Sequence, residues 1–539
     1  MDTEYTSIWN EYEKCKNYLD GQQLFSKSEK CHDFVDGDQW KGLKVPAGIE
    51  KPPQLNILQP ILKNATALVG QHSMDVTFSP LNKTVNKEKY IKMCDALNKF
   101  AADTWEKLKL DSKLWDVLED AYITGDSMMY FYWKDEEIKA EILDNVNVLF
   151  ADENNPEIQE QPFILIPQRK YVRDIREEAK KNGLSKEEIE KIVADKDIDK
   201  INGNKPEIEN DIKINVVTKM WKKDGVVRIA RATKTVVYQK ETALSTNDGK
   251  VTLYPIAKYS WKLRKNCARG AGDIWDKIPN QIEINKGVYR FCQAVKCNAF
   301  PHKVFMETAL SPQAIENLDT PGSNISVRGS VQNINNIVGY LQPASISPYA
   351  ASIWQNLIDL TRSLAGAGDN LENINPEQAS GSAINAAREA KALNVNNQVA
   401  AYKQFLEDIA MIWADMWRAY NIEPIIFNEQ IIMPEEFANL KPSVRVDISP
   451  NTPFSKLAQE TELKELFIAG HISFEEYVEA LSDNSNIPKG KLKEIIEKRK
   501  ELNNNAMSNM QNGDVQRQYE TGTQLNGRLG SQDNIQMPQ

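Results

Sequence analysis

Few side chains in this sequence have the types and spacing that catalysis needs. The four histidines are isolated, and the motifs GxxxxGK[ST], GxSxG and HExxH are missing, which argues against P-loop, serine-hydrolase and zinc-peptidase chemistry. Gly270-Ala-Gly272 resembles half of a dinucleotide fingerprint, but no further glycine completes it. Asp144, Asp152 and Glu153 could bind a divalent ion, although a turn rich in acceptors is the simpler interpretation. We therefore expect no enzyme, no cofactor and no metal site.

The cysteine pattern indicates thiols rather than disulfides or a zinc site. The sequence has no CxxC pair, and Cys292 and Cys297 are too far apart for a zinc knuckle. We expect free, buried or half-buried thiols at all six positions. These are Cys15, Cys31, Cys94, Cys267, Cys292 and Cys297.

Length and charge narrow the possible functions further. A chain of 539 residues with 41% hydrophobic content is long enough for more than one folded unit. The net charge of −10 argues against a nonspecific grip on nucleic acid, yet it suits a surface past which DNA must slide, because negative charge repels phosphate. The sequence contains no apolar run of about 18 residues, so we expect no membrane-spanning segment. The acidic, aromatic start lacks the features of a secretory signal, so we expect synthesis and folding in the cytoplasm.

The first half of the chain predicts helices followed by strands. A helix is expected over 1–35, ending at the glycine-flanked segment 37–42. Alternation on both sides of Asp224-Gly225 predicts a hairpin. The segment 173–200 is a charged helical pair with a capping box, Ser185 and Glu188, and we interpret it as a solvated insertion. Further helices are expected over 56–71, 87–108 and 112–124, and strands over 127–133, 139–150, 161–172, 213–221 and 226–238.

Two long helices, over 273–299 and 348–365, flank a β-leaning insert over 300–347. At 1.5 Å per residue, such helices run roughly 30–40 Å. An antiparallel pair of this kind buries its apolar stripes if copies pack side by side in a closed ring. On geometry alone, a helical hairpin within an ordinary α+β domain is equally compatible. The residues expected to pack are Ile278, Ile282, Tyr289, Ile353, Leu357, Leu360 and Leu364.

The C-terminal part divides into a loop, a long helix and a small helical group. Residues 366–382 are rich in Gly, Asn and Ser and contain no Lys or Arg, as suits a mobile loop. A helix to about residue 420 and short strands occupy 383–454. A helical group with a second capping box, Ser473 and Glu476, follows over 455–502, and the Asn- and Gln-rich tail 503–539 is expected to be disordered.

The order of several short blocks along residues 5–500 resembles the portal protein family of tailed bacteriophages. Each block is weakly specific by itself, and the order, the spacing and the helix–insert–helix unit carry the resemblance. The charged segment 173–200 departs from the family pattern. The blocks are Gly37-Asp-Gln-Trp40, Asn56–Pro60, Val76–Pro80, Asp120–Gly125, Tyr254-Pro255 with Trp261, Gly270–Asp273, and Pro279-Asn-Gln281 with Asn285.

The resemblance implies an α+β portal architecture in a ring-forming subunit. It assigns a wing to 36–272 together with strands after 420, a stem to the two long helices, a clip to 300–347, a tunnel loop to 366–382 and a crown to 455–502. The tunnel-loop residues that it would place toward DNA are Asp369, Asn370, Glu372, Asn373, Asn375 and Glu377.

The resemblance also implies a location and a set of partners. A ring of twelve subunits would occupy one capsid vertex of the virion, after assembly in the host bacterial cytoplasm. Double-stranded DNA would pass through it during packaging and ejection. The partners would be terminase, the major capsid and scaffold proteins, and head–tail connector proteins. A different head–tail adaptor or tail ring protein is the alternative, although such chains are usually shorter.

Overall fold

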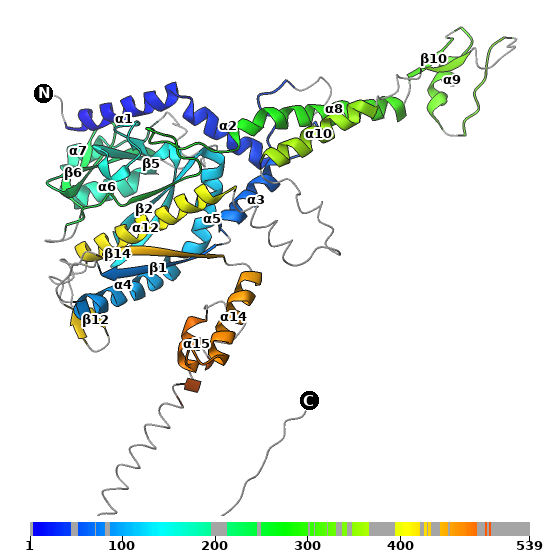
Figure 1. Ribbon diagram of the computed structural model, residues 1–539. Coiled ribbons are helices and arrows are strands. Elements are labelled where there is room, and N and C mark those ends of the chain that lie inside the picture. Colours follow the sequence, from blue (N-terminus) through cyan, green and yellow to red (C-terminus); the bar gives the residue numbers. More distant parts are fainter. Residues whose placement is uncertain are drawn as a thin grey trace, which may run out of the picture. The chain divides into compact units, whose positions relative to one another are not determined.

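The protein is mixed α and β, and it divides into two compact units, Met1–Ser449 and Pro450–Gln539. Figure 1 shows the elements of this computed structural model. The structure describes residues 4–44, 52–70, 72–80, 87–195, 213–244, 250–299, 302–306, 308–320, 322–329, 337–341, 348–365, 394–420, 425–427, 430–432, 442–450, 453–481, 491–492, 495–496 and 498.

Two helices stand where the sequence predicted one. Helix α1 (Glu4–Gly21) ends at a turn, and α2 (Leu24–Asp36) starts after Gln23, whose φ of 58° lies in the left-handed region. The turn lets each helix bury a different apolar face. A further helical group comprises α3 (Leu58–Gly70), α4 (Lys87–Leu108) and α5 (Leu110–Thr124).

Two antiparallel sheets form the middle of the first unit. The three-stranded sheet has the order β3-β2-β9, and the five-stranded sheet has the order β4-β5-β6-β7-β8. The hairpin at Asp224-Gly225 is confirmed, with positive φ at both turn residues. The strands are β2 (Asp126–Lys134), β3 (Glu137–Asp144), β4 (Leu149–Phe150), β5 (Phe163–Tyr171), β6 (Lys213–Lys223), β7 (Val226–Ala232), β8 (Val237–Ala243) and β9 (Ile256–Ser260).

Two expected strands are each divided in the structure. The 3₁₀ turn Asn145–Asn147 interrupts the segment 139–150, so that β3 and β4 join different sheets. The segment 226–238 turns back at Thr233, whose hydroxyl hydrogen-bonds to Val236, and this produces the separate strand β8. Alternation marks both halves of such a segment but does not mark the turn between them.

Helix α12 (Asn396–Tyr420) is the central helix of the largest hydrophobic core. It packs against β9, and against β1 (His72–Pro80), which pairs with β14 (Pro442–Pro450). Its buried Asp415 accepts hydrogen bonds from Thr252 and from Leu253 N, which fixes the loop before β9. Two short strands, β12 (Ile425–Phe427) and β13 (Gln430–Ile432), form a separate pair.

Helices α8 (Ile278–Ala299) and α10 (Pro348–Leu364) form an antiparallel pair. Asn280 donates to the Thr361 hydroxyl (3.3 Å), while Phe291 and Trp354 meet near the other end, with ring centroids 6.3 Å apart. Helix α8 starts later than expected, because the 3₁₀ turn Trp275–Lys277 precedes it.

The segment between these helices has a small core of its own. Strands β10 (His302–Phe305) and β11 (Val338–Leu341) pair in antiparallel fashion, and helix α9 (Pro312–Glu316) lies between them in the sequence. The buried residues of this core are Ala309, Leu310, Ala314 and Ile337.

The expectation that 173–200 is only a solvated insertion is wrong for one side of it. Helices α6 (Val172–Lys181) and α7 (Lys186–Glu190) form, and the capping box of Ser185 with Glu188 is present. However, Val172, Ile175 and Ala179 are buried against strands of the five-stranded sheet. Their three- and four-residue spacing forms a narrow apolar stripe within a strongly charged sequence.

The second unit contains helices α14 (Pro453–Ile468) and α15 (Phe474–Ala480). Ser473 and Glu476 form the expected capping box of α15. Its small core includes Tyr477, Val478 and Leu481. The tunnel-loop residues expected over 366–382, the first part of the helix expected from 383, and the tail 503–539 lie outside the described residues.

Candidate assembly interface at the α8–α10 pair

The expected stem-packing residues divide into two groups. Ile278 is buried, and Ile282 and Leu357 pack against the main core, while Tyr289 is half-buried. In contrast, Ile353, Leu360 and Leu364 point away from α8 and are exposed. Of the α10 stripe at 353, 357, 360 and 364, only Leu357 packs against the described core. The contact between α10 and α8 involves Trp354 and Thr361, which lie on a different side of α10 from Ile353.

A buried network of amide side chains fixes the first turns of α8. Gln281 is fully buried, and its Nε2 donates to Leu55 O (2.6 Å) and to Asn285 Oδ1 (3.0 Å). Its Oε1 accepts from Ile57 N (3.2 Å). Asn285 in turn donates to Gln39 Oε1 (2.6 Å). We call Gln39, Gln281 and Asn285 the amide network.

Gln39 extends the amide network to the end of α2. Its Nε2 donates to Phe34 O (2.7 Å), and its side chain is also fully buried. Asn56 lies beside the network, donates to Val35 O and caps the start of α3 through Leu58 N. The side chains quoted from three separate sequence blocks thus meet at the start of one helix. Sequence reasoning selected these residues but gave no indication that they touch.

Close backbone packing holds the segment that leads into α8. A Cβ atom at Gly272 would lie 2.6 Å from Ile123 O, and one at Gly270 would lie 2.9 Å from Gly125 O. Gly270 N donates to Asp126, and Asp273 N donates to Tyr122 O. The Gly270–Asp273 block therefore needs its glycines for close approach to the end of α5, rather than for a phosphate.

Ion pairs and buried carboxyls surround this glycine contact. Asp273 pairs with Lys262 and with Lys277 (3.2 Å). Burial alone would raise the pKa of Asp273, but the two lysines outweigh it and lower that pKa below its usual range. Asp120 is different, because burial and then the nearby Asp144 raise its pKa well above the usual range.

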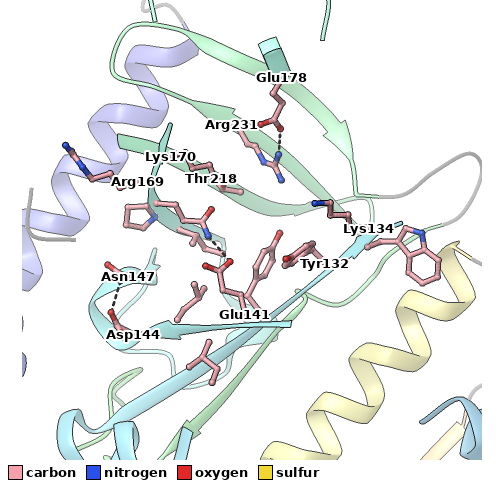
Figure 2. Close-up of a pocket in the computed structure, with 17 residues that line it drawn as sticks. Tyr132, Lys134, Glu141, Asp144, Asn147, Arg169, Lys170, Glu178, Thr218 and Arg231 are labelled. Atoms are coloured by element: carbon pink, nitrogen blue, oxygen red, sulfur yellow. Dashed lines mark hydrogen bonds and ion pairs between the residues drawn. The ribbon is translucent and has the colours of Figure 1, made fainter. Parts of the chain in front are cut away.

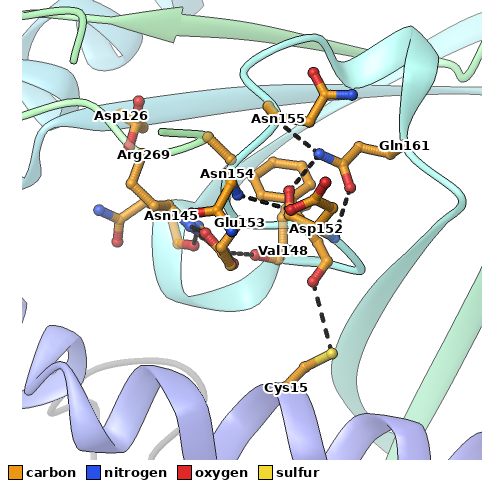
Figure 3. A network of polar contacts seen from close by, with 12 residues as sticks. Cys15, Asp126, Asn145, Val148, Asp152, Glu153, Asn154, Asn155, Gln161 and Arg269 are labelled. Carbon is orange, nitrogen blue, oxygen red and sulfur yellow. Dashed lines mark hydrogen bonds and ion pairs between the residues drawn. The ribbon is translucent and has the colours of Figure 1, made fainter. Parts of the chain in front are cut away.

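A second polar cluster, shown in Figure 3, joins the loop after β4 to the segment before α8. Buried Arg269 donates to Val148 O (2.6 Å) and Asn145 O, and it pairs with Glu153 (2.9 Å). Gln161 closes the same loop through the main chain of Asp152. Glu153 thus pairs with the guanidinium of Arg269, and Asp152 is part of a turn. Neither carboxylate is arranged to bind a divalent ion. Among the described residues, no cluster of three or more His, Cys, Asp or Glu side chains could hold a metal.

The outer side of α10 carries apolar side chains that nothing in the described chain covers. Tyr349 is 79% exposed, Ile353 67%, Leu360 59% and Leu364 81%. Spacings of four, seven and four residues place them on one helical face, which differs from the side that carries Trp354, Ile358 and Thr361. A helix with apolar residues on both sides needs a second partner to remove the outer face from water. We call these four residues the outer α10 face.

The thiols are free, as expected, but they are not all buried. Cys31 and Cys94 are buried, Cys15, Cys267 and Cys292 are half-buried, and Cys297 on α8 is exposed. Burial raises the pKa of Cys15 to about 11 and of Cys31 to about 12. These two are therefore protonated, unreactive thiols at neutral pH.

Comparison with known proteins gives no indication of function, so we infer a function from the geometry described above. No protein-family model matches the chain, and no curated protein matches it either. Within the part of the chain that the structure describes, none of the helices has the length and apolar content to cross a membrane.

Proposed function

We propose that the chain is one subunit of a tailed-bacteriophage portal ring at a capsid vertex of the virion. In this proposal, double-stranded DNA passes through the ring during packaging and ejection. Terminase, the major capsid and scaffold proteins, and head–tail connector proteins dock on it, and a ring of about twelve subunits follows from the resemblance. A separate ATPase supplies the energy of translocation, so the chain itself is not an enzyme.

The observation that carries the proposal is the outer α10 face beside a firmly anchored α8. No described residue of the same chain covers Tyr349, Ile353, Leu360 and Leu364, and leaving these side chains in water costs free energy in proportion to their apolar area. A neighbouring copy that presents a different side of its own helix pair would cover this face. Such a head-to-tail contact closes into a ring when the rotation per subunit divides the circle.

The amide network adds an independent argument. Portal-like residues from blocks around 37–40, 56–60 and 279–285 converge at the start of α8. A helix pair that transmits load between neighbours must leave the wing at a fixed angle, and fully paired buried amides enforce one geometry. The convergence supports the resemblance because each block would otherwise be a weak match in isolation.

The proposal is tested by the assembly state of the purified full chain. Negative-stain images should show rings with a central hole, and mass photometry should give a mass near an integral multiple of 61.2 kDa, with about twelve copies. Monomers at micromolar concentration would contradict the proposal. Rings of a much smaller copy number would favour the alternative, a head–tail adaptor, if loss of the protein also left DNA packaging unchanged.

A pair of matched variants ties the assembly to the outer α10 face. Ile353→Asp with Leu360→Asp places charge on that face and should convert rings to single subunits. Ser352→Asp with Ser363→Asp adds the same two negative charges at exposed positions beside the apolar stripe, and it should leave rings intact. Equal assembly of both variants would exclude this face as the contact.

The tunnel-loop part of the proposal rests on composition alone. The segment around Asp369, Glu372 and Glu377 carries acidic but no basic side chains, so it should touch DNA without binding it tightly. Deletion of 369–378 should leave rings intact but reduce packaging or retention of DNA, measured as nuclease-protected genome per particle. Unchanged packaging and retention would remove this role.

A further inference from the structure

A cleft lies between the two antiparallel sheets, and Figure 2 shows the residues that line it, none of which belongs to α8 or α10. Its volume is about 800 Å³, which lies within the range of sites for small organic ligands. One wall consists of β2 and β3, with Tyr130 and Tyr132 in stacked contact (ring centroids 5.8 Å apart). The other wall consists of β5, β6 and β7. Gln168 crosses between the walls and donates to Glu141 (3.1 Å).

The strand register gathers donor groups on the second wall. Ile166 lies opposite Thr218, and Thr218 lies opposite Arg231, so one row runs across three strands. Lys170 follows Ile166 on the same strand at an even spacing, and therefore projects from the same face. Lys170, Thr218 and Arg231 all line the cleft, as Figure 2 shows.

Two cations on this wall, Arg231 and Lys170, retain unused hydrogen-bonding capacity. Arg231 pairs with Glu178 through one terminal nitrogen, but its buried Nε has no hydrogen-bond partner among the described residues. No described side chain or main-chain oxygen forms a hydrogen bond or ion pair with Lys170 Nζ. A buried donor without a partner costs free energy, and a bound acceptor would remove that cost.

The acidic groups of the cleft do not accept hydrogen bonds from Arg231 Nε or Lys170 Nζ. Glu178 is held by Arg231, Glu141 accepts from Gln168, and Asp144 accepts from Asn147 Nδ2 (3.1 Å). Burial lowers the pKa of Lys170, the neighbouring Arg231 lowers it further, and the nearby Glu178 and Glu141 offset this only in part. A dianion between Lys170 and Arg231 would relieve the repulsion between these two cations.

We propose that this cleft binds a phosphate monoester, with the phosphate between Lys170 and Arg231 and the organic group against Tyr130 and Tyr132. A tetrahedral phosphate offers several acceptor oxygens to donors that approach from different strands, including the Thr218 hydroxyl. The cleft is far larger than phosphate alone, and its tyrosine rings provide a face for an organic group. The site lies outside the proposed assembly contact and does not depend on ring formation.

Isothermal titration of the purified full chain tests the proposal with three probes: ribose 5-phosphate, inorganic phosphate and glutarate. Ribose 5-phosphate should bind at least as tightly as inorganic phosphate, and both should bind more tightly than glutarate. Binding of inorganic phosphate without binding of the ester would overturn the assignment to a monoester. Stronger binding of glutarate, or no binding of any probe at millimolar concentration, would overturn the phosphate assignment.

Substitution of Lys170 by Met provides the residue-specific test. Loss of one charge-assisted hydrogen bond should weaken ribose 5-phosphate binding by about tenfold or more. Lys170→Met removes a desolvated, unpaired charge, so it should not unfold the protein, and an unchanged melting temperature would establish this. Lys240→Met, at an exposed position of the same sheet outside the cleft, should bind like the original chain. Equal affinity in the Lys170→Met variant would contradict the proposal.

Discussion

The start of α8 and the outer face of α10 reverse the usual distribution of polar and apolar side chains. At the start of α8, the amides of Gln39, Gln281 and Asn285 are almost completely buried. On the outer α10 face, large apolar side chains such as Ile353 and Leu364 are exposed. The buried amides are paired with one another and with main-chain groups, so they hold one geometry. The exposed face has no such pairing, and only another surface can cover it.

The difference shows that the start of α8 stabilises the fold of the subunit, while the outer α10 face stabilises association with another surface. Buried polar pairs favour one arrangement within a chain because every alternative leaves donors unsatisfied. An apolar face has no direction of its own, and it favours any association that removes area from water. Changes at the start of α8 should therefore alter folding of the subunit, while changes on the outer α10 face should alter only its association.

The largest effect is expected from Gln281→Ala. The change leaves the N–H of buried Ile57 and the carbonyl of Leu55 without their side-chain partner, and it removes a hydrogen bond to Asn285. We expect a loss of about 3 kcal/mol in the free energy of unfolding of the first unit, measured by urea denaturation. Gln59→Ala, at an exposed position of α3, is the control and should change that free energy by less than about 0.5 kcal/mol. A small loss for Gln281→Ala would show that the amide network does not anchor α8.

A somewhat smaller loss is expected from Gly272→Ala. The new Cβ would lie 2.6 Å from Ile123 O and 2.9 Å from Tyr122 O, both main-chain atoms that cannot move independently. The unfolding free energy should fall by about 2 kcal/mol. Gly21→Ala, whose Cβ would meet nothing within 4 Å, should leave stability unchanged or slightly raised. Equal stability of the two variants would mean that the contact with the end of α5 is loose.

Asp120→Asn should increase stability in a pH-dependent way. The pKa of Asp120 is raised in the folded chain, so the folded state binds its proton more tightly than the unfolded state. Stability therefore falls as pH rises from the unfolded pKa, about 4, toward the folded pKa, and the asparagine removes this loss. The melting temperature should rise at pH 7, and the gain should vanish below about pH 4. Asp103→Asn, at an exposed position of α4, should give no gain.

The smallest effect on subunit stability is expected from Leu364→Ser. Leu364 is 81% exposed, so the subunit loses little buried area, and its unfolding free energy should change by less than about 0.5 kcal/mol. The same substitution should lower the fraction of assembled protein at low concentration, measured by mass photometry. A large loss of subunit stability together with unchanged assembly would reverse the comparison between the two regions.

Much of the element order could be predicted from the sequence. The hairpin at Asp224-Gly225 and the capping boxes of Ser185 and Ser473 are present, because turn and cap chemistry acts over a few neighbouring residues. The two helices around the insert also lie close to their expected positions. Boundaries were less predictable, as the division of the first helix at Gln23 shows.

Only part of the candidate site could be predicted from the sequence. Leu360 and Leu364 were selected by spacing, but spacing cannot say which of two apolar stripes on α10 faces α8. The buried stripe of α6 was missed because its charged neighbours dominate the segment. The cleft was not foreseen at all, since Lys170 and Arg231 are brought together only by the pairing of three strands.

The sequence by itself determined the local elements, because helix periodicity, turn residues and caps act between residues close along the chain. Only the tertiary structure decided that Gln39 and Asn285, 246 positions apart, share a hydrogen bond, and that the described residues leave one side of α10 uncovered. The physical reason is that burial and pairing depend on which distant surfaces meet. No local pattern contains that information.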